Sequence, residues 1–176
     1  MRFSSFWPVA VTYLLVILSA NWLAASYIWP VGFGLKAPAG VFSIGLALAL
    51  RDWLHELRGL RAALVVAYVA GVLSFVLSEV MGWTALRSVA LGSVAAFAFS
   101  ETTDALVYHP LRRRHAYLGL VLSNAVGLLV DSAIFLMIAF GSLAFFWGQV
   151  VGKSEMTLVA LGLIWALRLW RQPVVA

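Results

Sequence analysis

The chain has 176 residues, of which 64% are hydrophobic and 11% charged, with a net charge of +5 and no cysteine. A soluble domain carries about 25% charged residues, so this composition excludes a water-soluble protein and indicates a single integral membrane domain covering residues 1–176. Disulfides and thiol chemistry are excluded. The basic residues lie mostly between apolar segments, where orientation in a bilayer explains them better than a nucleic acid partner does.

Six segments approach the roughly 20 apolar residues that a membrane-spanning helix needs. The first is too long for a signal peptide, whose apolar region has about 7–15 residues. Pro30, Lys36 and Pro38 mark the first loop, and Pro110 marks the fourth. We therefore expect an all-α, six-transmembrane-helix bundle with helices at about 6–28, 38–57, 61–81, 87–108, 116–140 and 144–170.

The arginines predict the orientation of these helices. One side of the bundle would carry Arg2, Arg58, Arg61, Arg112, Arg113, Arg114, Arg168 and Arg171. The opposite side would carry only Lys36 and Arg87. Because cytoplasmic loops are enriched in Lys and Arg, we expect a multi-pass protein of the cytoplasmic (inner) membrane with both termini inside the cell.

Polar residues inside the expected spans are the main functional signal. A charged side chain at the centre of a spanning helix costs about 2.5–3.5 kcal/mol on insertion scales, so it usually faces the bundle interior or a watery pathway. The set comprises Asn21, Arg51, Asp52, Glu56, Glu101, Asp104, Asn124, Asp131, Lys153 and Glu155.

Two of the expected helices place such residues along one face, since positions three, four or seven apart share a side of a helix. Each stripe combines carboxylates or amides with small residues and an aromatic ring, which suits a pocket for a flat, polar heterocycle. The fourth helix has Ser93, Phe97, Ser100, Glu101 and Asp104, and the fifth has Asn124, Gly127, Asp131 and Phe135.

Structural roles are the alternative for each of these residues. Carboxylates near the cytoplasmic helix ends, such as Asp104, could pair with arginines there, whereas Glu101, one turn deeper, should gain less from them. Asp131 could form an interhelical salt bridge with Lys153. Asn21 and Asn124 could equally be hydrogen-bonding contacts between helices.

No other chemistry is indicated by the sequence. His55, His109 and His115 lack metal-ligand spacing, and neither a phosphate-binding loop nor a hydrolase motif is present. We therefore expect no catalytic residue, no metal and no cofactor, and the protein is not expected to be an enzyme. A membrane enzyme or signalling scaffold is a minor third alternative.

Five features in order resemble the vitamin uptake transporter family, also described as queuosine-precursor transporters. They are "SANWLAA", "PAGVFSIGLALALRDWLHE", "RSVALGSVAAFAFSETTDALVY", "LSNAVGLLVDSAIFLMIAFG" and Lys153, and they span roughly Ala20 to Lys153. Departures cluster in the second helix: Ser43 stands where many members have proline, and Arg51 directly precedes Asp52.

The resemblance implies import of a 7-deazaguanine, either 7-cyano- or 7-aminomethyl-7-deazaguanine, without a dedicated ATPase. It also implies a fold similar to the substrate-binding subunits of energy-coupling-factor transporters. The expected partners are a heterocyclic small molecule and the lipid bilayer. Whether the protein forms a homo-oligomer is left open by the sequence. We expect the substrate to be bound by Asn21, Asp52, Phe97, Glu101, Asp104, Asn124, Asp131, Phe135 and Lys153.

The chemistry of the side chains suggests which part of the substrate each residue would bind. A guanine-like edge presents two N–H donors suited to one carboxylate, here Asp131 or Glu101. Asn124 would read the carbonyl, and phenylalanines would stack on the ring. The alternative function is a vitamin-binding subunit of an energy-coupling-factor complex with ATPase partners, for which the small-residue pair Ala20 and Ala24 would be the docking face.

Overall fold

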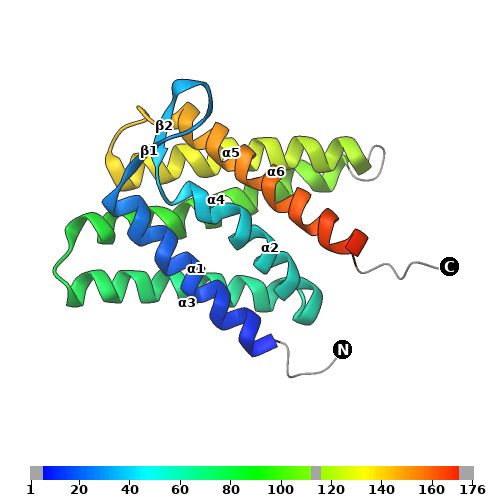
Figure 1. Ribbon diagram of the computed structural model, residues 1–176, viewed down its shortest axis with the longest axis horizontal. Coiled ribbons are helices and arrows are strands. Elements are labelled where there is room, and N and C mark those ends of the chain that lie inside the picture. Colours follow the sequence, from blue (N-terminus) through cyan, green and yellow to red (C-terminus); the bar gives the residue numbers. More distant parts are fainter. Residues whose placement is uncertain (1–5, 112–115, 171–176) are drawn as a thin grey trace.

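The computed structural model describes residues 6–111 and 116–170, and within them the chain is almost entirely helical (Figure 1). The described residues form six long helices, as expected from the sequence. A short antiparallel hairpin joins the first two helices. The elements are α1 (Phe6–Ser26), β1 (Ile28–Pro30), η2 (Gly32–Gly34), β2 (Lys36–Pro38), α2 (Val41–Arg58), α3 (Leu60–Val80), α4 (Thr84–Leu111), α5 (Ala116–Phe140) and α6 (Phe146–Trp170).

Two boundaries differ from the sequence expectation. Pro38 does not open the second helix but ends β2, where it pairs with Ile28, and α2 begins at Val41. Pro110 does not lie in a loop, because α4 continues to Leu111. Proline lacks the N–H of a helical hydrogen bond, and its ring crowds the carbonyl four residues earlier; α4 extends only one residue beyond Pro110.

Three of the helices are long and apolar enough to cross a membrane, counting only the described residues. These spans are Phe6–Ser26 in α1, Arg61–Val80 in α3 and Val121–Phe140 in α5. Their outward faces carry large exposed apolar side chains such as Leu15, Val65 and Val121. An apolar surface of this extent suits contact with lipid. The other three helices carry most of the charged residues singled out above, whereas Asp131 lies in α5.

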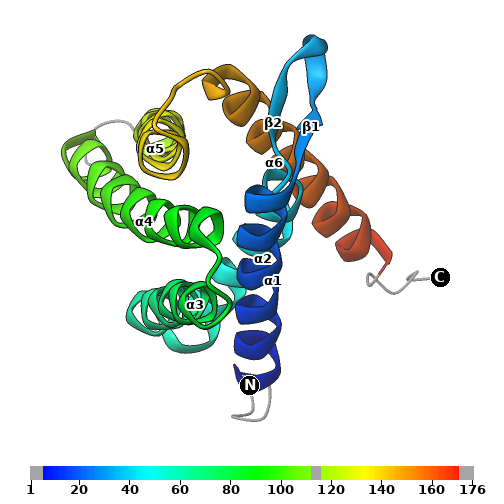
Figure 2. The ribbon, with the colours of Figure 1, turned by 90° about the vertical axis from the view of Figure 1, so that its left-hand side faces the viewer.

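The helices form two groups. In the first, α4 and α5 pack along most of their length, with a close approach at Gly92, where a Cβ atom would lie 3.1 Å from the Phe135 carbonyl oxygen. In the second, α2 packs against both α1 and α6. Figure 2 shows α4 and α5 on one side of the molecule and α1, α2 and α6 on the other. The remaining helix, α3, contacts both groups, through α1 and α2 on one side and α4 on the other.

The start of α2 lies directly against α1. A Cβ atom at Gly40 would lie 2.6 Å from the carbonyl oxygen of Ala20 and 2.9 Å from the Cβ of Ala24. Both alanines are buried by this contact. The interpretation of this small-residue pair as a docking face for a partner is therefore wrong, because the chain's own second helix covers it.

Both ends of the described chain lie at the same end of the molecule. The start of α1 and the end of α6 are found there, together with the α2–α3 turn, whereas the hairpin and the α3–α4 turn lie at the opposite end (Figure 1). Arg58 and Arg61 flank the α2–α3 turn. Lys36 and Arg87 belong to the opposite end, as the sequence predicts. That the arginine-rich end faces the cytoplasm stays a prediction.

Candidate functional site: a polar cavity between the helix groups

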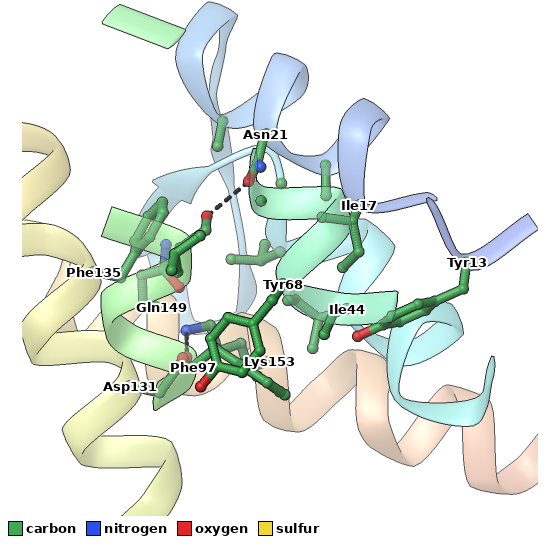
Figure 3. Close-up of a pocket in the computed structure, with 18 residues that line it drawn as sticks. Tyr13, Ile17, Asn21, Ile44, Tyr68, Phe97, Asp131, Phe135, Gln149 and Lys153 are labelled. Atoms are coloured by element: carbon green, nitrogen blue, oxygen red, sulfur yellow. Dashed lines mark hydrogen bonds and ion pairs between the residues drawn. The ribbon is translucent and has the colours of Figure 1, made fainter. Parts of the chain in front are cut away.

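A cavity of about 140 Å³ lies between the two helix groups. One buried water needs roughly 10–15 Å³ on the same scale, so the space is sufficient for a small organic molecule. All six helices contribute to its wall, which is mostly apolar (Figure 3). Its polar side chains are Tyr13, Asn21, Tyr68, Ser93, Asp131, Gln149 and Lys153.

An ion pair joins α5 to α6 at the wall of the cavity. Lys153 Nζ donates to Asp131 Oδ2 and, at 3.3 Å, to Ser132 Oγ. The same ammonium lies 5.8 Å from the centre of the Phe135 ring. Lys153 is buried, and Asp131 keeps 29% of its side chain exposed. The interhelical salt bridge considered from the sequence is thus present, and it lies at a place where a ligand can reach it.

Asn21 connects three helices beside the same cavity. Its Nδ2 donates to Ser74 Oγ on α3 at 2.9 Å, and its Oδ1 accepts from Ser93 Oγ on α4 at 2.7 Å. The side chain is buried. The alternative that Asn21 holds helices together is what the structure shows, although the residue also lines the cavity.

Aromatic rings form another part of the wall. Phe97 on α4 meets Tyr68 on α3 edge to face, with ring centres 5.8 Å apart and an interplanar angle of 78°. The guanidinium of Arg51 lies 5.7 Å from the Phe97 centre and pairs with Glu101. The expectation that Glu101 lies too deep to gain much from an arginine is therefore wrong, since α2 brings Arg51 to it.

Five of the nine expected substrate-binding residues line the cavity. They are Asn21, Phe97, Asp131, Phe135 and Lys153. Glu101, Asp104 and Asn124 do not line it, and for Asp52 the side chain lies outside the described part of the structure.

The packing of α5 against its neighbours explains why Asn124 does not line the cavity. Near Asn124 the helix contacts α4 through Gly127, where a Cβ atom would lie 3.9 Å from the Cβ of Asp104. On its other side α6 diverges from α5 (Figures 1 and 2). Asn124 is therefore exposed, although it lies two turns from Asp131 on the same helical face.

Gln149 is the functional candidate that the sequence reasoning missed. It lies in the first turns of α6, is 2% exposed, and no described protein group donates to its Oε1 atom. The available signal was its position four residues before Lys153, which places both side chains on one face of the helix. Because Gln149 lies near the start of the expected 144–170 helix, it is less conspicuous than a polar residue at mid-membrane.

These features define a class of protein. The chain is a helical membrane protein whose outward faces are apolar and whose interior holds a small-molecule-sized cavity with a few polar groups. Within the described residues, no three His, Cys, Asp or Glu side chains gather in a way that could hold a metal ion.

Comparison with known families assigns the chain within that class. The sequence profile of the family described as "Putative vitamin uptake transporter" matches residues 78–170, and the chain belongs to this family. It is accordingly a vitamin-type membrane transporter. The matched part runs from the end of α3 through α6 and includes Phe97, Asp131, Gln149 and Lys153. Comparisons with curated proteins and with solved structures gave no match.

Proposed function

We propose that the protein imports a 7-deazaguanine precursor of queuosine across the cytoplasmic membrane, with both ends of the chain inside the cell. Membership of the transporter family supports transport. The observation that narrows the substrate is the Asp131–Lys153 pair beside the rings of Phe97 and Phe135 in one cavity. Apolar faces with few converging polar groups are typical of sites for planar ligands.

The ion pair offers a hydrogen-bonding pattern complementary to guanine. One edge of a guanine ring carries an N–H donor beside a carbonyl acceptor. Asp131 supplies carboxylate oxygens as acceptors, and Lys153 has three N–H donors, of which Asp131 and Ser132 take two. In our proposal the N–H donor beside the carbonyl of the substrate binds Asp131, and that carbonyl accepts from Lys153.

The arrangement of polar contacts supports a mechanism for opening. Three of them bridge the two helix groups around the cavity: Ser93 to Asn21, Lys153 to Asp131, and Arg51 to Glu101. We propose that α4 and α5 move as one body against α1, α2 and α6. During this motion a ligand or water can replace each polar partner. Breaking these contacts therefore costs less free energy than separating a continuous apolar interface would.

Uptake in cells tests this function. Cells that cannot synthesise 7-deazaguanines and lack other importers should accumulate labelled 7-cyano-7-deazaguanine when they express this protein. An Asp131→Asn variant should lose most uptake, because an amide accepts more weakly and no longer balances Lys153. A matched Glu56→Gln variant changes an exposed carboxylate outside the cavity and should transport normally. Absence of uptake by wild-type protein confirmed in the membrane would refute the proposal, and normal uptake by Asp131→Asn would refute the role of Asp131.

A further inference from the structure

Gln149 presents a hydrogen-bond acceptor that no described protein group satisfies. Gln149 is one of the residues that line the cavity, its Oε1 atom is buried, and the residue is 2% exposed. Burying an amide oxygen without a donor destabilises the folded protein, and such groups are rare enough in native structures to require an explanation. Figure 3 shows Gln149 among the side chains that surround the cavity.

The fold holds this amide in place. The Gln149 backbone N–H donates to the Phe145 carbonyl at 2.8 Å, at the start of α6. The preceding residue, Gly148, lies so close to β2 that a Cβ atom there would collide with the Lys36 carbonyl oxygen. This contact holds the start of α6 against the hairpin, and Gln149 follows it among the residues that line the cavity.

The cavity as a whole carries no unbalanced charge. Among the described residues that line it, only Asp131 and Lys153 are ionic, and they pair with each other. A ligand carboxylate would find no unpaired cation there, and a ligand ammonium would find no unpaired carboxylate. Both would lose hydration without adequate compensation.

We propose that Gln149 is a specificity-determining residue, whose Oε1 atom accepts a ring N–H from an uncharged, planar heterocycle. The inference rests on the proposed transport function and deepens it. Of the two expected substrates, 7-cyano-7-deazaguanine is neutral, whereas the amine of 7-aminomethyl-7-deazaguanine is protonated at neutral pH, as alkylamines are. The cavity therefore selects the cyano compound.

Calorimetric titration of the full-length, detergent-purified protein tests this assignment. The ligands are 7-cyano-7-deazaguanine, 7-aminomethyl-7-deazaguanine, guanine, xanthine and biotin. Replacing Gln149 by Met keeps the approximate volume and removes the acceptor, so affinity for the cyano compound should fall about tenfold. The melting temperature of the unliganded variant should equal or exceed that of the wild type, because an unsatisfied buried group is gone. A purely structural glutamine predicts a lower melting temperature instead.

A second variant probes the charge argument. Gln149→Glu keeps an acceptor and adds a negative charge, so preference should shift from the cyano toward the aminomethyl compound. Unchanged preference in this variant, or wild-type affinity in Gln149→Met, would overturn the assignment to Gln149 while leaving the transport proposal intact.

The wild type separates the two proposals further. If it binds guanine or xanthine but neither 7-deazaguanine, the proposed substrate is wrong, and the effect of Gln149→Met on the bound purine still decides the role of Gln149. If it binds none of the five ligands, both proposals are overturned.

Discussion

Lys153 is the side chain on which the polar contacts of the cavity converge. It reaches α5 through Asp131 and Ser132 and lies beside the Phe135 ring. A buried cation of this kind is tolerated because its partner is held in place across the interface. The same contact makes the pair responsive to any ligand that competes for the Asp131 carboxylate.

Removing only one member of this pair should be more damaging than removing both. Lys153→Met leaves the Asp131 carboxylate without its cation, and we expect a loss of about 3 kcal/mol in the free energy of unfolding. The double variant Lys153→Met with Asp131→Leu should recover more than half of that loss. The measurement is unfolding of the purified protein in mixed detergent–SDS micelles. Additive losses in the double variant would show that the two residues do not interact.

Charged residues inside the expected helices were predictable from the sequence, whereas their partners were less so. Asp131 and Lys153 are conspicuous in otherwise apolar helices, and their mutual pairing was a foreseeable alternative. The pairing of Arg51 with Glu101 was not foreseeable, because sequence spacing does not reveal that α2 approaches α4 at this point. Gln149 was missed because it lies near the start of the expected sixth helix, where a polar residue is less conspicuous than at mid-membrane.

Two groups of helices meet around the cavity, and the transport proposal depends on their relative motion. Within the first group, α4 and α5 approach closely at Gly92. Between the groups, Arg51 and Glu101 connect α2 to α4 beside Phe97. This contact lies outside the cavity lining, so it can be altered without touching the proposed substrate.

Cross-linking can distinguish motion between the groups from motion within one. The natural chain has no cysteine, so introduced pairs react without background. Arg51→Cys with Glu101→Cys, bridged by a bis-methanethiosulfonate reagent, should abolish uptake, and reduction should restore it. The control pair is Gly92→Cys with Ala139→Cys, positions where a Cβ at residue 92 would lie 3.3 Å from the Ala139 Cβ. Its disulfide should leave uptake intact, and full uptake by the bridged first pair would refute relative motion of the groups.

The helices were predictable as elements, whereas the hairpin was not. Long apolar stretches gave the six helices to within a few residues. Strands of three residues show no alternating pattern, so Pro30, Lys36 and Pro38 indicated only a loop. The divergence of α6 from α5, which leaves Asn124 exposed, also depends on packing that no single helix encodes.

The whole molecule places its exposed basic residues unevenly. Arg58 and Arg61 flank the α2–α3 turn, whereas at the opposite end Arg87 donates to Glu79 at 3.0 Å. Arginine side chains therefore accumulate toward the end that also holds the start of α1 and the end of α6. This distribution supports an orientation with that end in the cytoplasm.

Labelling of single cysteines tests the orientation. Glu56→Cys lies near the basic end of α2 and Met81→Cys in the α3–α4 turn, and both positions are exposed. A membrane-impermeant maleimide should label residue 81 in intact cells and residue 56 only after the membrane is opened. Neither substitution removes a basic residue, so neither should itself alter the topology. The reverse labelling pattern would contradict the proposed orientation.

The proposed function requires that this chain alone moves a neutral 7-deazaguanine across a membrane. The most direct measurement is uptake of radiolabelled 7-cyano-7-deazaguanine into liposomes that contain only the purified protein. We expect saturable uptake that unlabelled compound inhibits and that the Asp131→Asn variant largely loses. Uptake no greater than in protein-free liposomes would contradict this function. If uptake then appears when ATPase and coupling subunits are added, the protein is instead a vitamin-binding subunit of an energy-coupling-factor transporter.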